Sequence, residues 1–124
     1  MRTYTVIDRL VALLATVALI AWATVTTAQQ VAIDSDDIGG IVASVDGPEA
    51  GVWVIAETED FETRYAKIVV TDDQGRYVVP DLPDANYDVW VRGYGLADSD
   101  KVAATPGDAI DLTAIVAPNA AVAA

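Results

Sequence analysis

The sequence predicts an all-β fold, a Greek-key β-sandwich of about seven antiparallel strands. Three observations predict it: the apolar runs are short, turn residues bound each run, and no stretch has the apolar period of a helix. Apolar and polar residues alternate within several runs, as in strands that bury one face against a second sheet. The expected strands cover residues 38–45, 51–57, 65–71, 76–79, 86–94, 101–104 and 109–117.

The clearest strand boundaries lie within residues 71–83. Asp73 and Gly75 provide turn chemistry, because aspartate bonds to nearby backbone groups and glycine adopts positive φ. Residues 76–79 then alternate in polarity as far as Pro80, which cannot continue a central ladder. This stretch therefore predicts a turn, a strand and a second turn that leads into the next strand.

Two other strands differ in their patterns. Residues 87–92 alternate strictly, which predicts one buried and one outward face. Residues 68–70 form the continuous apolar run Ile-Val-Val, which predicts a strand buried on both faces.

The first 28 residues have the pattern of a signal peptide and its helix. Arg2 and Arg9 make the start positive, residues 10–23 are apolar, and small residues precede a cleavage point after Ala28. The alternative is an uncleaved membrane anchor, although residues 10–25 fall short of the roughly 20 that a spanning helix needs. Either way, the remainder is expected outside the cytoplasm, in the periplasm or the extracellular space.

The remaining chain divides into an acidic linker at residues 29–37, the sandwich at 38–117 and an Ala-rich tail at 118–124. Without the leader it carries 5 Lys and Arg against 18 Asp and Glu, so its net charge is 5 − 18 = −13. This charge argues against nucleic acid and anionic membrane surfaces as partners. There is no Cys, so an apolar core must stabilise the domain without disulfides.

Three segments of the chain resemble a known family, the carboxypeptidase regulatory-like domain. Residues 51–54 match its Gly-Val strand start, residues 71–77 its T-D-x-x-G-x-Y turn, and residues 82–89 its L-P-x-x-x-Y-x-V re-entry. The resemblance covers residues 38–117. It implies a transthyretin-like (prealbumin-like) sandwich that is not catalytic and that recurs as an accessory module in exported bacterial proteins. The implied fold is similar to that of carbohydrate-binding sandwiches.

The residue inventory argues against catalysis. The chain has neither His nor Cys, which excludes imidazole acid–base chemistry, thiol nucleophiles and the usual zinc sites. Acidic runs at residues 34–37, 72–73 and 98–100 could offer oxygens to Ca²⁺, but none has the twelve-residue loop with its closing Glu. Aspartates in turns more commonly accept backbone hydrogen bonds. We therefore expect no enzyme activity, no metal and no cofactor.

Aromatic side chains are the candidate binding residues. If Val52 and Val54 point inward, Trp53 points outward. The same alternation in the expected strand 86–94 directs three further candidate side chains outward. Exposed aromatic groups stack on sugar rings or anchor a protein partner. The alternative is that another part of the protein covers them. The candidate binding residues are Trp53, Trp90, Arg92 and Tyr94.

The sequence thus predicts an exported, non-catalytic accessory module that contacts a protein partner or an adjoining domain. One alternative is a carbohydrate-binding module that uses the outward aromatic side chains. Another is the N-terminal part of a longer exported enzyme. Membrane association is expected only if the leader is not cleaved.

Overall fold

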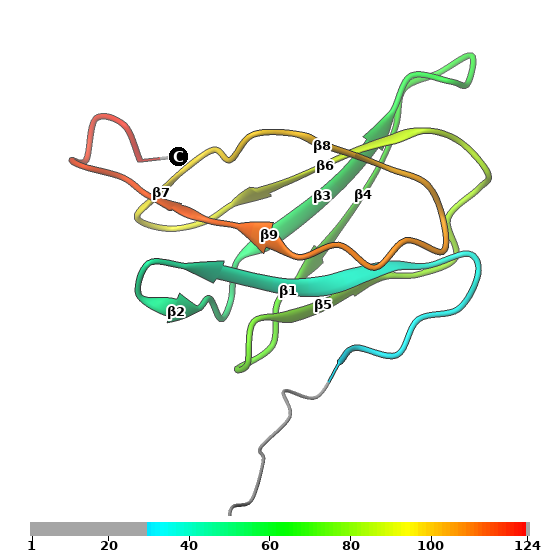
Figure 1. Ribbon diagram of the computed structural model, residues 1–124. Coiled ribbons are helices and arrows are strands. Elements are labelled where there is room, and N and C mark those ends of the chain that lie inside the picture. Colours follow the sequence, from blue (N-terminus) through cyan, green and yellow to red (C-terminus); the bar gives the residue numbers. More distant parts are fainter. Residues whose placement is uncertain (1–29, 124) are drawn as a thin grey trace, which may run out of the picture.

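The computed structural model describes residues 30–123, and these residues form strands, turns and loops but no helix. Accordingly, none of the described residues form a helix that could cross a membrane. The expected signal peptide lies outside this range. The ten strands of the described residues (Figure 1) are β1 (Ile38–Ser44), β2 (Gly47–Pro48), β3 (Trp53–Thr58), β4 (Tyr65–Val70), β5 (Arg76–Val79), β6 (Tyr87–Arg92), β7 (Leu96–Ala97), β8 (Val102–Ala104), β9 (Leu112–Thr113) and β10 (Ile115–Val116).

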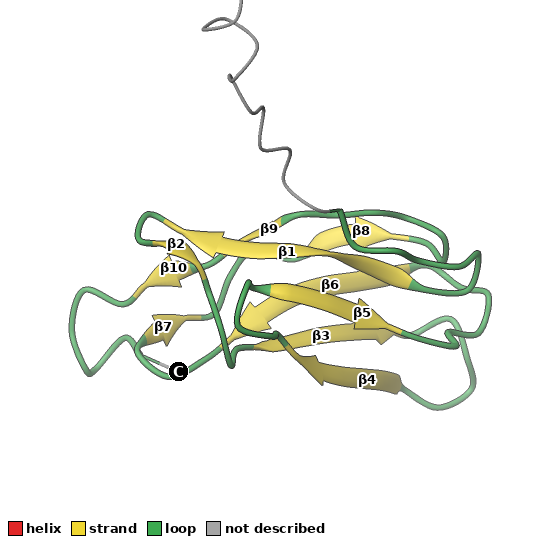
Figure 2. Ribbon diagram, turned by 90° about the horizontal axis from the view of Figure 1, so that it is seen from below, coloured by secondary structure: helices red, strands yellow, loops and turns green. Residues whose placement is uncertain are grey.

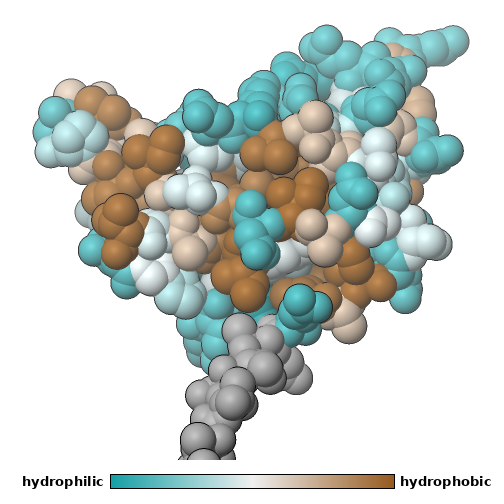
Figure 3. Space-filling model, viewed as in Figure 1, coloured by the Kyte–Doolittle hydropathy of each residue, from teal (hydrophilic) through white to brown (hydrophobic). Residues whose placement is uncertain are grey.

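One sheet has the strand order β4-β3-β6-β8, and all its pairs are antiparallel. Its central strand β6 has the burial alternation that the sequence predicts: Tyr87, Val89 and Val91 are buried, and the residues between them point to the other face. The acidic loop 59–64 connects β3 and β4. This loop projects from the body of the protein (Figure 1) and its surface is hydrophilic (Figure 3).

The second sheet is built around β1. Strand β5 pairs antiparallel with the first half of β1, the short strand β2 pairs with its end, and β9 runs parallel to it. This parallel pair departs from the expected all-antiparallel arrangement. It arises because residues 108–114 return along β1, where Ile110 N donates to Gly39 O at 2.7 Å and Ala114 N to Ala43 O at 2.8 Å.

The two sheets bury a common apolar core. Seen edge-on, β1 and β9 lie on one side of the molecule, and β3 and β4 lie on the other (Figure 2). The fully buried side chains come from both sheets, which makes the fold sandwich-like. The largest of them are Tyr87, Ile38, Val42, Val54, Val79, Val89 and Val91.

The turn between β4 and β5 depends on Asp72 more than on the expected Asp73. The Asp72 carboxylate accepts the backbone N–H groups of Gln74 and Arg76, both at 2.9 Å, and pairs with the Arg76 guanidinium at 2.7 Å. Gly75 adopts φ +73° and lies against the Val42 carbonyl, where a Cβ atom would come within 2.5 Å of the oxygen. Glycine is therefore required at this turn.

Strand β4 differs from its prediction. It is an edge strand paired only with β3 among the described residues, and its residues alternate between half-buried and exposed. Ile68 and Val70 are exposed, so the prediction of burial on both faces is wrong. The continuous apolar run reflects one inward residue, Val69, between two outward ones.

Residues 30–37, expected to be a linker, pack against the domain. Val31 and Ile33 are partly buried and approach Gly39, where a Cβ atom would meet the Ile33 side chain at 2.5 Å. Asp37 is buried, and its carboxylate accepts the backbone N–H groups of Asp34 at 2.9 Å and Asp81 at 3.3 Å. These contacts fix the chain as it enters β1.

Candidate interaction surface

The candidate site lies on the outer face, which we define as the side of the β4-β3-β6-β8 sheet that points away from the core. Residues directly opposite each other on paired strands share a face. Trp53 is opposite Val70, and Ile55 is opposite both Ile68 and Trp90. These five side chains therefore form one group, which we call the outer apolar patch.

Three members of the patch are open to solvent. Trp53, Ile68 and Val70 expose 50%, 53% and 57% of their surfaces, whereas Ile55 between them is buried at 6%. The exposed side chains thus surround a filled centre, and the patch is a raised apolar surface instead of a cavity. A contiguous exposed apolar surface of this kind marks an interaction site in many soluble proteins.

Trp90 is outward, as expected, but other side chains cover it. The Arg92 guanidinium lies 5.0 Å from the centre of its ring, and the Lys101 ammonium lies 5.7 Å from it. Both distances suit cation–π attraction. Its buried Nε1 atom makes no hydrogen bond with any described residue. The indole of Trp90 therefore supports the charged side chains and offers little free surface.

Glu57 joins the cations at this end of the face. Its carboxylate pairs with the Lys101 ammonium and with the Arg64 guanidinium, the latter at 3.0 Å. The hydrogen bond from Lys101 lowers the pKa of Glu57 despite partial desolvation, and the charges of Lys101 and Arg64 lower it further. Glu57 is thus a charged anchor for two cations.

Arg92 is held by a two-pronged ion pair. Its Nε and Nη2 atoms donate to the Asp98 carboxylate at 2.8 and 2.6 Å. This pair raises the pKa of Arg92 and lowers that of Asp98. Because Arg92 is also directly opposite Trp53, the structure brings together Trp53, Trp90 and Arg92, three of the four residues that the sequence singled out.

Tyr94 is the fourth residue, and it lies outside this group. It is fully exposed in the turn between β6 and β7. There it lines a hollow of about 490 Å³ together with residues of the C-terminal segment 117–123. Residues 118–123, the described part of the expected tail 118–124, form a turn in which Val122 N donates to Asn119 O at 3.2 Å.

Two exposed residues of the patch, Ile68 and Val70, were not predicted from the sequence. Their signal was present in the chain, because both alternate with Val69 and so share a face, but the uninterrupted run hid the alternation. Only the position of β4 at the sheet edge, next to Trp53, reveals their exposure.

The charged side chains around the outer apolar patch carry a net negative charge. Six of them lie on the outer face or pair with residues there: Arg64, Arg92, Lys101, Glu57, Asp88 and Asp98. Glu59 and Asp60 of the acidic loop share a hollow of about 470 Å³ with Glu57, Arg64, Asp88 and Lys101. Together these eight groups are three cations and five carboxylates.

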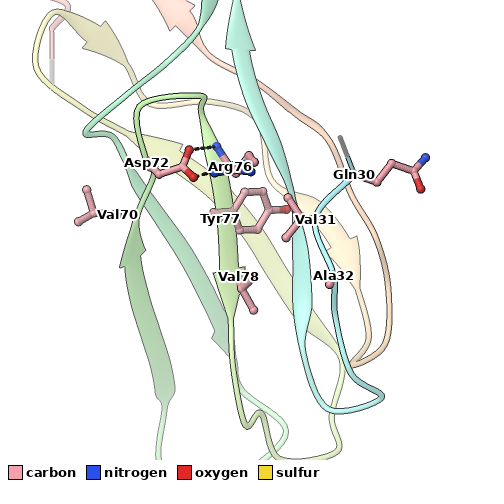
Figure 4. A pocket seen from close by; sticks show the side chains of 8 residues that line it. All are labelled: Gln30, Val31, Ala32, Val70, Asp72, Arg76, Tyr77 and Val78. Atoms are coloured by element: carbon pink, nitrogen blue, oxygen red, sulfur yellow. Dashed lines mark hydrogen bonds and ion pairs between the residues drawn. The ribbon is translucent and has the colours of Figure 1, made fainter. Parts of the chain in front are cut away.

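Two other features have structural explanations. A hollow of about 400 Å³ lies along β5, lined by residues 30–32 and by Val70 of β4, and Figure 4 shows the Asp72–Arg76 ion pair on its wall. These two groups already satisfy each other in the turn. The carboxylates of Asp34, Asp36 and Asp37 lie within 4.8 Å of one another, but Asp37 serves as the backbone acceptor described above.

No model of a known protein family matches this chain, and no curated protein matches its sequence. The resemblance to the carboxypeptidase regulatory-like domain therefore stays a prediction from the residues that carry it.

Proposed function

We propose that this protein is an exported, non-catalytic accessory module that binds another polypeptide through the outer apolar patch. One observation carries the proposal: Trp53, Ile68 and Val70 lie together on one sheet face with about half of each side chain exposed. Aromatic and aliphatic side chains in such a cluster are typical of the centre of a protein interface. The ion pairs of Glu57 and Arg92 provide the polar rim that such interfaces have.

A polypeptide fits the patch better than a sugar does. A carbohydrate site of this kind needs aromatic rings as stacking platforms. Trp90 is covered by Arg92 and Lys101, and Tyr94 lies at the β6–β7 turn, so Trp53 is the only predicted aromatic residue left on the open face. The aliphatic neighbours Ile68 and Val70 supply apolar area but no hydrogen bonds to sugar hydroxyl groups.

The proposal includes a transthyretin-like fold of the carboxypeptidase regulatory-like kind. Its support is the turn at residues 71–77, in which Asp72 and Gly75 perform distinct backbone roles, and the two-sheet core. It also includes export, which rests on the leader pattern of residues 1–28. Sequencing of the exported protein should find Gln29 at its N-terminus; an intact Met1 would favour the anchor instead.

Site-specific photo-crosslinking tests the binding function. The photoreactive residue p-benzoylphenylalanine replaces Ile68 in one variant and Val116 in another; Val116 is a comparably exposed strand residue on β10. Irradiation of the exporting cells should give a discrete polypeptide adduct from position 68 and little from position 116. Equal labelling at both positions, or no adduct at position 68, would refute the proposal.

The sugar alternative has its own readout. The tryptophan fluorescence of Trp53 and Trp90 should stay constant when the purified protein is titrated with soluble glycans. A saturable change that Trp53→Phe weakens and Trp53→Ala abolishes would favour the carbohydrate-binding module in place of the polypeptide site.

A further inference from the structure

A hollow with negative charge adjoins the outer apolar patch. Ile55 is the buried centre of the patch, and Glu57, two residues further along β3, points to the same face. Glu57 is directly opposite Asp88 on β6, and both line the hollow of about 470 Å³, which we call the acidic hollow. Successive residues on one face of a strand are about 6.6 Å apart, so the acidic hollow begins one residue pair beyond the centre of the patch.

The cations of the domain are already engaged. Four ion pairs and one hydrogen bond to a carbonyl involve every Lys and Arg among residues 30–123: Arg64 and Lys101 with Glu57, Arg76 with Asp72, Arg92 with Asp98, and Lys67 with Pro80 O. The ion pairs use three carboxylates, so 18 − 3 = 15 of the described carboxylates have no cation partner. A basic partner therefore finds carboxylates that can receive its charges, whereas an acidic partner finds no unpaired cation.

Three of these carboxylates line the acidic hollow. Glu59 and Asp88 are exposed and make no ion pair with any described residue. The Asp60 carboxylate accepts the backbone N–H of Asn86 at 2.8 Å and its side-chain amide at 3.2 Å. Both donors are neutral, so they tie the acidic loop to the start of β6 without cancelling its charge. The acidic hollow thus holds negative charge at a fixed place beside the patch.

We propose that the polypeptide bound by the outer apolar patch is basic, and that it seats Lys or Arg side chains in the acidic hollow beside the apolar side chains that it places on the patch. The inference rests on the proposed function, because it names the chemistry of the partner of that patch. Lys and Arg suit this junction, since their stems pack on apolar surface while their charged ends reach polar groups.

The spacing of the surface sets the pattern that such a partner needs. In an extended segment that lies along the strands, alternate residues face the sheet. Two apolar side chains at positions i and i+2, over Trp53 and Ile55, place the side chain at i+4 over the Glu57–Asp88 pair. A second copy of this chain fits poorly, because it would bring a further net charge of −13.

Charge reversal in the photo-crosslinking variant at position 68 tests the inference. Asp88→Lys is added in one protein and Asp46→Lys in the other. Both aspartates are exposed and the change in net charge is the same, but Asp46 lies in the turn between β1 and β2 on the other sheet. An exposed ion pair changes an affinity by about two- to fivefold, and reversal adds repulsion, so Asp88→Lys should reduce the adduct about fivefold or more and Asp46→Lys less than about twofold.

Two further variants guard against a loss caused by misfolding. Asp88→Asn removes the charge and keeps the shape, and it should reduce the adduct by about two- to fivefold. Glu59→Lys lies on the loop, outside the strands, and should act as Asp88→Lys does. The circular dichroism spectra of the purified variants should match that of the unmodified protein. Mass spectrometry of the adduct should find Lys or Arg within about six residues of the crosslinked position, which is enough to span the patch and the hollow.

The outcomes separate this inference from the proposed function. Equal adduct yields from the Asp88→Lys and Asp46→Lys proteins would overturn the inference, as would a crosslinked segment without Lys or Arg near the attachment point or a covalent dimer of this chain. Each of these results would leave the proposed function standing, because position 68 would still capture a polypeptide. No adduct from position 68 would refute both.

Discussion

Replacing Gly40 by alanine should destabilise the fold strongly, because the backbone of the C-terminal segment lies against this residue. A Cβ atom at position 40 would lie 1.9 Å from the Ile110 carbonyl oxygen, whereas ordinary contact begins at 3.4 Å. The carbonyl would have to retreat by about 1.5 Å. That movement would disturb its hydrogen bond from the Tyr77 hydroxyl at 2.6 Å and the neighbouring bond from Ile110 N to Gly39 O at 2.7 Å.

The expected loss follows from these contacts. Two hydrogen bonds contribute about 1 kcal/mol each, and overpacking of a close-packed site costs roughly 1–3 kcal/mol. Gly40→Ala should therefore lower the free energy of unfolding by about 3–5 kcal/mol, a large part of the total for a domain of this size.

Urea unfolding followed by tryptophan fluorescence measures this loss, provided that the denaturant slope stays constant. Gly51→Ala is the matched control: a Cβ atom there meets nothing within 4 Å, although φ is +70°. Its only penalty is the left-handed backbone conformation, about 1 kcal/mol. If Gly40→Ala is no more destabilising than Gly51→Ala, the close approach of the two segments is not as described.

Two further outcomes are expected. Asp72→Ala should lower the urea midpoint clearly and Asp73→Ala hardly at all, because only the former accepts the backbone N–H groups of the turn; equal effects would contradict this assignment. Glu57→Gln should remove the stabilisation that the charged Glu57 carboxylate provides. In the unmodified protein this stabilisation is complete above pH 4.5 and disappears as the pH falls through the lowered pKa of Glu57. The two proteins should therefore differ in free energy of unfolding at neutral pH and become equally stable in acid.

The sequence predicted those parts of the fold that depend on neighbouring residues. Strand β6 was predicted by its strict alternation, and β5 by the turn before it and Pro80 after it. The outward direction of Trp53 and Trp90 followed from the same period of two. In each case the information lies within a few residues of the feature.

Features that depend on distant partners were not predictable in this way. The run Ile68-Val69-Val70 reads the same in a strand buried on both faces and in an edge strand, and only the missing neighbour of β4 distinguishes them. The cover over Trp90 likewise depends on Lys101, which comes from the segment before β8. The short strands β2 and β7 have too few residues to show any period.

The parallel pair of β1 and β9 has a consequence for the order in which the fold forms. Ile41 bonds to the side chain of Asp111, 70 residues further along the chain, at 3.0 Å. Closing so long a loop is slow, and contacts of this kind delay folding. One edge of β1 therefore has no partner until residues 108–114 have folded back along it. The first strand to be made is among the last to be completed.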